Sequence, residues 1–346
     1  MTENVYSWLA DSSGRQSEHY GDARRDGAGP GTRSRAASSS APVIIGVSLA
    51  MQRVRMLIDQ LAPTRLAIHI YGPSGVGKEL VACALHVQSR VRGQLVAFNV
   101  CSIPDSLFEA TLFGHVRGAY TSAVRDNAGY IRQAAHGTLF LDEIGSLPES
   151  NQVKLLRVLE TGEVRPLGAD RNERTDFRLV SASNENLDEL EARGTFRLDL
   201  SRRLRGAVIS IPPLDTRPED IPHLVQHHLD LQAEATGWRG TITASAIKVL
   251  VDRSWRGNVR ELMQVMDCVV AISGGRDINA RLIREALELQ ALDFVGADAE
   301  FVKGLRQLMM MADGRVDIAA KAMGVHRSTI YRQLRRAGLK PSGDLG

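Results

Sequence analysis

The sequence predicts an α/β protein, in which a parallel sheet carries helices on both faces and a helical region follows. Two observations lead to this fold class. From Pro42 onward, short apolar runs alternate with segments of helical spacing, an order that is typical of parallel sheets. The first apolar run also ends in a glycine-rich turn that opens a helix. The expected strands are Leu66–Tyr71, Val96–Val100, Thr138–Leu141 and Phe177–Ala182.

Helical spacing follows the glycine-rich turn and dominates the later part of the chain. A helix is expected over Glu79–Gln88, and from Pro218 to about Gln290 the strand pattern stops. The helices expected in that region begin at Ile221, lie near Ala244–Asp252, begin at Asn258 and lie near Ala280–Leu289. We therefore expect an α/β part over residues 42–217 and a helical part over residues 218–290.

Both ends of the 346-residue chain differ from this region. Residues 1–41 are rich in Gly, Ser, Ala and Arg and bury too little apolar surface to offset their ordering entropy, so we expect a disordered leader. Residues 291–300 are expected to be a linker and residues 301–346 a compact helical unit. That unit carries nine Lys/Arg against three Asp/Glu, which indicates nucleic acid as its partner or, on charge alone, a solvated helix face.

Composition and cysteine spacing exclude several classes of protein. No stretch has the roughly 20 consecutive apolar residues that span a bilayer, and the N-terminus lacks the apolar run of a signal peptide. The three cysteines, Cys83, Cys101 and Cys268, form no CxxC pair, which argues against a disulfide framework or a zinc ribbon. We expect a cytoplasmic protein without membrane insertion.

The glycine-rich turn is a candidate phosphate-binding loop. Its sequence fits G-x-x-x-x-G-K and stands between an expected strand and an expected helix. Glycines let backbone N–H groups curl around phosphates, and the helix N-terminus adds a favourable dipole. We expect the Lys78 ammonium against the β- and γ-phosphates of ATP, and Glu79 stands where Ser or Thr usually ligates magnesium. The expected nucleotide-binding residues here are Gly72, Pro73, Ser74, Gly75, Val76, Gly77, Lys78 and Glu79.

A second motif delivers two carboxylates at the end of an apolar strand. Asp142 and Glu143 directly follow the run Leu139-Phe140-Leu141. Asp142 is expected to hold Mg²⁺, directly or through water. Glu143 is expected to polarise the attacking water, because hydrolysis needs a nucleophile oriented in line with the γ-phosphate.

These motifs resemble the bacterial enhancer-binding proteins, the AAA+ activators of sigma-54 RNA polymerase, over about residues 42–340. The acidic Glu79 also occurs in that family's phosphate loop, and Gly137–Ile144 (GTLFLDEI) is similar to its Walker B strand. Further similar segments are Leu112–His115, Lys154–Arg157, Phe196-Arg197, Arg203-Leu204, Pro212–Leu214 and Trp255–Leu262. The resemblance implies an AAA+ P-loop ATPase with an α-helical lid and a C-terminal Fis-type helix-turn-helix domain, of the type that lacks an N-terminal receiver or sensor domain.

The resemblance also implies roles for single residues. Ile44, Ile45 and Gly46 match the segment that packs on the adenine, and Arg260 matches the sensor arginine of the lid. Asn99 matches an asparagine that restrains the catalytic glutamate, and Asn184 matches the sensor of the γ-phosphate. Arg197 and Arg203 match arginine fingers supplied to the neighbouring subunit's nucleotide. A permanently charged guanidinium suits developing phosphoryl charge, and a finger in trans requires an oligomer.

A loop that contacts sigma-54 is implied as well, in altered form. Family members carry Gly-Ala-Phe-Thr-Gly-Ala, and the matching residues here are Gly118, Ala119, Tyr120, Thr121, Ser122 and Ala123. Tyr120 keeps an aromatic ring, whereas Ser122 replaces a glycine. At a positive φ, serine there would cost about 1 kcal/mol of strain.

The basic C-terminal unit has the pattern of a helix-turn-helix. Apolar spacing over Val316–Met323 and His326–Arg336, joined at Gly324-Val325, gives a small core. The outer face of the second helix would meet base edges with its N-terminal part. The expected DNA-binding residues are His326, Arg327, Ser328, Thr329, Tyr331, Arg332 and Gln333.

Together these expectations describe an ATP-hydrolysing activator that binds double-stranded enhancer DNA and remodels sigma-54 RNA polymerase to promote open-complex formation. The alternative is an ATP-binding, oligomeric DNA-binding regulator that does not remodel the polymerase, because its GAYTSA loop is altered. A homo-oligomer is expected, a dimer at rest and a hexamer when active. Since only the leader precedes the ATPase, control is expected from a separate inhibitor or co-activator protein, or from expression.

Overall fold

The computed structural model describes residues 42–120 and 123–290 of the chain. Two compact units divide these residues. The first holds the described residues up to Arg239 together with Leu250–Met266, and the second holds Gly240–Val249 together with those from Asp267 onward. The predicted leader at residues 1–41, the linker at 291–300 and the unit at 301–346 lie outside the described residues.

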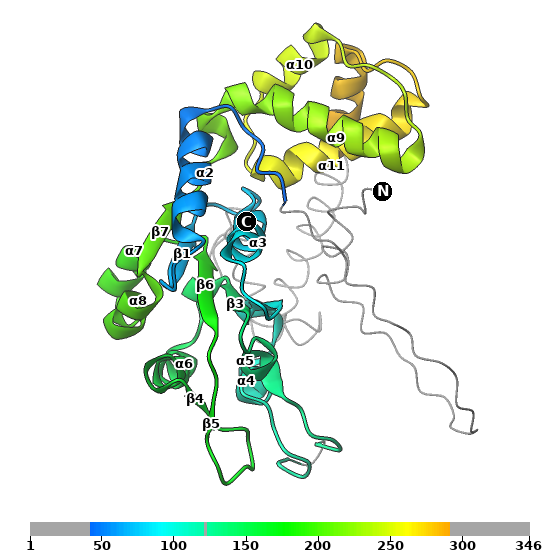
Figure 1. The fold of residues 1–346 in the computed structure, drawn as a ribbon. Coiled ribbons are helices and arrows are strands. Elements are labelled where there is room, and N and C mark those ends of the chain that lie inside the picture. Colours follow the sequence, from blue (N-terminus) through cyan, green and yellow to red (C-terminus); the bar gives the residue numbers. More distant parts are fainter. Residues whose placement is uncertain (1–41, 121–122, 291–346) are drawn as a thin grey trace, which may run out of the picture. The chain divides into compact units, whose positions relative to one another are not determined.

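A parallel sheet forms the centre of the first unit, as predicted. Its strand order is β2-β3-β6-β1-β7, and every neighbouring pair is parallel; β3, β6, β1 and β7 are labelled in Figure 1. The carboxyl ends of all the strands therefore meet at one edge. The strands are β1 (Ile68–Tyr71), β2 (Leu95–Asn99), β3 (Thr138–Asp142), β6 (Arg178–Ser183) and β7 (Ala207–Ser210).

Apolar side chains cover both faces of this sheet. On one face, α2 (Leu49–Leu61) and α3 (Lys78–Ser89) pack on the strand residues Ile68, Ile70 and Phe140. On the other face, a second buried cluster joins strand residues to five further helices. These are α4 (Asp105–Leu112), α5 (Gly129–Gln133), α6 (Glu149–Thr161), α7 (Leu187–Ala192) and α8 (Leu198–Leu204). Burial of strand residues on both faces explains why the sequence shows continuous apolar runs instead of alternation.

The four predicted strands are confirmed to within two residues at each end, and the structure adds others. β7 is a short edge strand whose Ala207, Val208 and Ser210 are partly or fully exposed, so its apolar signal is weak. An antiparallel hairpin of β4 (Glu163–Val164) and β5 (Glu173–Arg174) is equally short and mainly charged. Short 3₁₀ turns complete the unit: η1 (Val100–Ser102), η2 (Ile144–Ser146), η3 (Leu214–Thr216) and η4 (Pro218–Asp220).

Helices replace strands after η4, as the sequence predicts. They are α9 (Ile221–Thr236), α10 (Ala244–Val251), α11 (Asn258–Ser273) and the helical residues 280–290. α9 ends at Gly237, whose φ of 74° is the left-handed conformation that commonly stops a helix. In the second unit, Thr243 N and Ile278 N donate to the carbonyls of Ile278 and Thr241.

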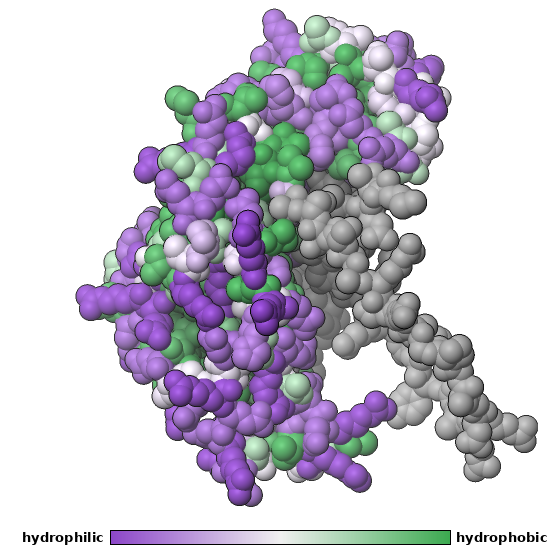
Figure 2. Space-filling view, in the orientation of Figure 1, coloured by the Kyte–Doolittle hydropathy of each residue, from purple (hydrophilic) through white to green (hydrophobic). Residues whose placement is uncertain are grey.

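The described surface is mainly polar on the face drawn in Figure 2, where hydrophilic side chains predominate and apolar ones form separate patches. Over residues 42–120 and 123–290, the helices fall short of the length and apolar character that crossing a bilayer requires.

A buried arginine joins the start of β6 to the ends of two helices. Arg178 is 4% exposed, and its Nη1 donates to the carbonyls of Ala62 (2.6 Å) and Leu85 (3.2 Å) while Nη2 donates to Leu61 (2.9 Å). The last carbonyls of a helix lack helical partners and carry partial negative charge. A buried cation at this place therefore holds α2 and α3 against the sheet.

Replacing Arg178 with methionine removes three donated hydrogen bonds while keeping most of the side-chain volume. We expect Arg178→Met to lower the free energy of unfolding by about 2–4 kcal/mol, because three carbonyls lose hydrogen bonds from a buried cationic donor. Urea unfolding followed by circular dichroism measures this change. The matched control is Arg65→Met, whose side chain is 78% exposed and pairs only with Asp176, so it should change stability far less. Equal unfolding midpoints for the two variants would contradict this role of Arg178.

Candidate functional site at the carboxyl edge of the sheet

The glycine-rich loop connects β1 to α3 at the carboxyl edge of the sheet, where the sequence predicts it. Gly75 and Gly77 have φ values of 78° and 104°, which residues other than glycine rarely adopt. A Cβ at Gly75 would also lie 2.2 Å from the carbonyl oxygen of Gly257. The loop thus requires glycine both for its backbone shape and for its close contact with the residues before α11.

Lys78 is the centre of the site. It opens α3 and is 8% exposed, and its Nζ donates to the carbonyls of Gly72 (2.9 Å) and Pro73 (3.1 Å) and to Asn184 Oδ1. Burial lowers the pKa of this ammonium from its ordinary value, and the charges of Asp142 and Glu143 oppose that shift. The partners in these hydrogen bonds are all neutral oxygens, so a charged phosphate oxygen would be a stronger acceptor.

Two carboxylates face this cation from the end of β3. Asp142 Oδ1 accepts a hydrogen bond from Glu143 N at 2.9 Å. Burial raises the pKa of Asp142, whereas this backbone hydrogen bond and the charge of Lys78 lower it. Glu143 has a φ of 57°, a left-handed conformation that is costly outside glycine and is often retained at functional sites. The pKa of the neighbouring Cys101 thiol is raised to about 11 by burial and by a hydrogen bond with Glu143.

Two asparagines end the strands on either side of β3. Asn99 stands in register with Asp142, and its Oδ1 accepts a hydrogen bond from Cys101 N at 2.8 Å. Asn184 follows β6 and accepts from Lys78, as described above. The sequence-predicted residues Lys78, Asp142, Glu143, Asn99 and Asn184 are therefore brought together along one edge of the sheet.

The residues at the start of α11 contact the loop through Ser74. Arg260 Nη1 lies 3.2 Å from Ser74 Oγ, which places the predicted sensor arginine beside the glycine-rich loop. Asn258 is 2% exposed with a φ of 55°, donates to Ser74 O (2.9 Å) and accepts from Leu214 N (2.8 Å). Asn258 belongs to a segment that the sequence analysis singles out, although its own contribution is not recognised there.

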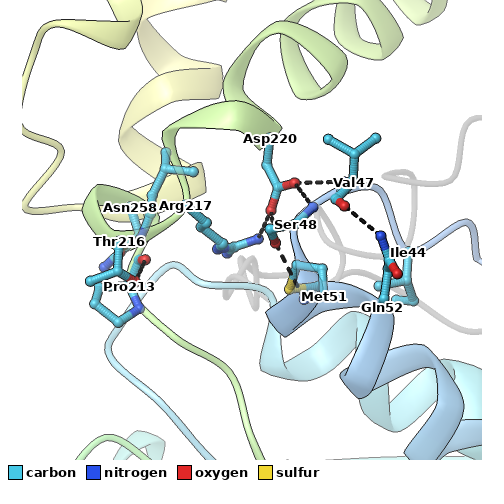
Figure 3. A network of polar contacts seen from close by, with 12 residues as sticks. Ile44, Val47, Ser48, Met51, Gln52, Pro213, Thr216, Arg217, Asp220 and Asn258 are labelled. Carbon is cyan, nitrogen blue, oxygen red and sulfur yellow. Dashed lines mark hydrogen bonds and ion pairs between the residues drawn. The ribbon is translucent and has the colours of Figure 1, made fainter.

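The segment Ile44–Gly46 and the residues after it are held by polar contacts, of which those of Asp220 with Val47 and Ser48 are drawn in Figure 3. Arg55 Nη1 donates to the carbonyls of Ile44 (3.1 Å) and Gly46 (2.7 Å). The next two residues, Val47 and Ser48, are bound by Asp220. Its carboxylate accepts hydrogen bonds from Val47 N (2.6 Å), Ser48 N (2.8 Å) and Ser48 Oγ (2.8 Å). Ser48 Oγ in turn caps α2 by accepting from Met51 N. Ile44, Ile45 and Gly46, all half-buried, are thereby fixed relative to η4.

A buried arginine completes this network. Arg217 is 1% exposed, and its Nη1 lies 3.5 Å from Asp220 Oδ2. Its Nε and Nη2 have no hydrogen-bond partner among the described residues. Burial lowers the pKa of the guanidinium, and the charge of Asp220 opposes this shift. Neither residue belongs to a motif that the sequence reveals: Asp220 pairs with Val47 and Ser48, 173 and 172 residues away, and Arg217 pairs with Asp220 itself.

The two predicted arginine fingers make contacts within their own chain. Arg197 forms a bidentate pair with Asp199, with Nε–Oδ1 and Nη2–Oδ2 distances of 3.1 and 2.7 Å. Arg203 donates through Nε (3.1 Å) and Nη2 (2.7 Å) to the carbonyl of Leu159. Both lie on or beside α8, away from the contacts of Lys78. Either guanidinium must exchange these partners to act on another molecule.

The stem of the predicted sigma-54 contact loop is described on both sides of residues 121–122. Gly118 N donates to Ala123 O and Ala123 N to Tyr120 O, both at 2.9 Å, so the loop closes on itself. The Tyr120 ring contacts His115 edge to face, with centroids 5.0 Å apart. Gly118 and Ala119 complete the described part. Thr121 and Ser122 lie outside the described residues, as do His326–Ser328, Thr329, Tyr331, Arg332 and Gln333.

The chain is similar in sequence to known transcriptional regulators. The sequence profile of the family described as "Sigma-54 interaction domain" matches residues 44–210, and that of the "AAA+ ATPase lid domain" matches residues 215–294. The C4-dicarboxylate transport transcriptional regulatory protein DctD of Rhizobium meliloti is 38% identical over 314 residues, which cover 88% of this chain and 66% of DctD. The transcriptional regulatory protein GlrR of Escherichia coli is 41% identical over 282 residues, covering 80% of this chain and 64% of GlrR. The chain thus spans about two thirds of the length of these relatives.

Solved structures show the same fold. The crystal structure of NtrX from Brucella abortus in complex with ATP has a TM-score of 0.64 and 34% sequence identity, covering 85% of this chain and 69% of NtrX. A RuvB variant from Thermotoga maritima matches with a TM-score of 0.51 at 16% identity, over 87% of this chain and 91% of RuvB. The RuvB likeness shows the fold alone.

The contacts of Asp220 generate a stability prediction. Asp220→Ala leaves two backbone N–H groups, a hydroxyl and the buried Arg217 guanidinium without their acceptor, so we expect the free energy of unfolding to fall by about 3 kcal/mol or more. Hydrogen exchange at residues 44–52 should accelerate in the folded protein. Asp277→Ala is the matched control, because Asp277 also accepts from a backbone N–H and a hydroxyl, both of Thr241, but at the surface. Unchanged hydrogen exchange at residues 44–52 in Asp220→Ala would contradict the conclusion that Asp220 holds this segment in place.

Proposed function

We propose that this chain, which belongs to the family of sigma-54-dependent transcriptional regulators, is an ATP-hydrolysing activator that remodels RNA polymerase carrying sigma-54. The observation that carries the proposal is the convergence of Lys78, Asp142, Glu143 and Asn184 at one edge of the AAA+ sheet. A buried cation, two strand-end carboxylates and an amide sensor are the groups that phosphoryl transfer from a nucleotide to water requires. NtrX, a relative with the same fold, has been crystallised with ATP.

Each residue then has a distinct task. Lys78 binds the β- and γ-phosphates, which replace the neutral oxygens around its Nζ, and the loop N–H groups and the α3 N-terminus bind the remaining phosphate oxygens. Glu143 orients the attacking water, and Asn99, on the neighbouring strand, restrains Glu143. Asn184, beside Lys78, and Arg260, beside Ser74, sense the γ-phosphate. Ile44, Ile45 and Gly46 pack against the adenine.

The donor chemistry at Asp142 fits magnesium. Mg²⁺ prefers oxygen ligands and is usually bound by one or two carboxylates together with substrate phosphates. Asp142 would hold the Mg²⁺ ion. Glu79 lies near enough to sense the charge of Asp142, because burial and then this charge raise the pKa of the half-buried Glu79. Within residues 42–120 and 123–290, His, Cys, Asp and Glu side chains form no cluster of three or more that could hold a metal by itself. Bound Mg²⁺ would neutralise charge on the phosphates.

Assembly and polymerase contact belong to the same proposal. Arg197 and Arg203 would leave Asp199 and Leu159 to reach a neighbouring subunit's nucleotide, which makes a homo-oligomer, a hexamer when active, part of the mechanism. The loop from Gly118 to Ala123 would contact sigma-54 through Tyr120. The C-terminal residues 301–346 would bind enhancer DNA as a helix-turn-helix, with the N-terminal part of its second helix at the base edges. We place this activity in the cytoplasm.

Open-complex formation tests the proposal. Purified sigma-54 polymerase on a dependent promoter should form open complexes, measured by permanganate footprinting, when this protein and ATP are added. Glu143→Gln should bind ATP yet yield few open complexes, because the attacking water is no longer oriented. Activity in Ser122→Gly but not in the wild type would instead favour the alternative, an ATP-binding DNA-binding regulator that does not remodel the polymerase. No activity in either protein, despite nucleotide hydrolysis, would contradict the activator assignment.

A further inference from the structure

A histidine lies in the interior of the sheet, next to the site but with no role in the function proposed above. His69 is the second residue of β1 and is 2% exposed. It stands in register with Ser181 of β6, and Tyr71 stands in register with Ser183. Because side chains alternate along a strand, His69 lies on the face opposite to Ile68 and Ile70.

Both ring nitrogens of His69 contact serine hydroxyls of β6. Nδ1 lies 2.9 Å from Ser181 Oγ, and Nε2 lies 3.1 Å from Ser183 Oγ. Ser183 Oγ donates its only proton to the carbonyl of Glu185 at 2.6 Å. Nε2 must therefore be the donor to Ser183, which leaves Nδ1 as the acceptor of the Ser181 hydroxyl proton. The network specifies one neutral tautomer.

The surroundings keep this ring neutral. Burial, followed by the positive charges of Arg205 and Lys78, lowers the pKa of His69 from 6.5 to about 4. Arg205 is itself paired with Asp188 and Glu191, and the charges that act on His69, those of Arg205 and Lys78, are both positive and disfavour an imidazolium. The chain of hydrogen bonds from Ser181 through His69 and Ser183 to Glu185 is thus fixed at physiological pH.

This series of hydrogen bonds ends at Ser183 and Glu185, the two residues on either side of Asn184. The Ser183 hydroxyl bridges to the carbonyl two residues later and so shapes the turn that carries the Asn184 amide. Ser183 O also accepts from Gly72 N at 3.3 Å, and Asn184 Oδ1 accepts from Lys78. Ser183 is therefore joined to His69 on one side and to both the phosphate loop and Asn184 on the other.

We propose that His69 is a positioning residue, which holds Ser183 through its Nε2–H and thereby aligns the Asn184 amide with Lys78 and the γ-phosphate. The inference rests on the proposed ATPase function. It assigns to His69 a contribution to hydrolysis and to discrimination between ATP and ADP, without any contact to the nucleotide. Affinity for the β-phosphate, which the loop and Lys78 supply, should remain.

Two amide substitutions of His69 distinguish the contribution of Nε2 from that of Nδ1. Gln can place its amide N–H near the position of Nε2 and keep the bond to Ser183, whereas Asn reaches only the position of Nδ1 and keeps the bond to Ser181. We expect His69→Gln to retain kcat for ATP within about threefold and His69→Asn to lower it about tenfold with KM nearly unchanged. Ser181→Ala, at the other end of the chain, should behave like His69→Gln, and Ser183→Ala like His69→Asn.

Titration with a non-hydrolysable ATP analogue and with ADP gives a second measurement that does not need hydrolysis. His69→Asn should lose about tenfold of its preference for the analogue over ADP, and His69→Gln should keep it. Equal kcat and equal preference in the Gln and Asn variants would overturn the proposal, as would a parallel loss of ADP affinity and thermal stability in both. An inactive wild type that still binds ATP would count against the proposed ATPase function, and the titration would still decide on His69.

Discussion

The contacts of the Lys78 ammonium are the interaction on which the site depends. A buried cation needs compensation, and here two loop carbonyls and one amide oxygen supply it, with two carboxylates nearby. These partners come from the phosphate loop, β3 and the end of β6. Because one side chain holds three segments, the loop is pre-organised before any ligand binds, and a bound phosphate need only replace neutral oxygens.

Around this centre, buried polar residues fix two segments beside the sheet and the end of one of its strands. Asp220 holds the segment before α2, Asn258 holds Ser74 of the loop, and His69 joins β1 to the end of β6. Each of these side chains is at most 2% exposed, so their hydrogen bonds form in surroundings where an unpaired partner would be costly. Shape at the site is therefore specified by polar pairing, whereas the sheet and its helices are specified by apolar burial.

Local features account for what the sequence predicts well. A glycine-rich turn between a strand and a helix, and two carboxylates at the end of an apolar run, are visible within ten residues, and the structure places both at the carboxyl edge. β7 is missed because an exposed edge strand has little apolar signal. Asp220 and His69 are missed for another reason: their partners lie 172 and 112 residues away, and no local pattern records such pairs. The left-handed φ of Glu143 is equally invisible in sequence, since it is imposed by the turn that follows β3.

Calorimetric titration with ATP in the presence of Mg²⁺ tests the central claim most directly. The matched pair is Lys78→Met and Lys248→Met, since both remove one ammonium from a helix but Lys248 is exposed on α10. The account predicts that Lys248→Met binds like the wild type and that Lys78→Met binds at least about a hundredfold more weakly, a loss of about 2.7 kcal/mol. Wild-type affinity in Lys78→Met would contradict the account, because the ammonium at the centre of the site would then make no net contribution to binding.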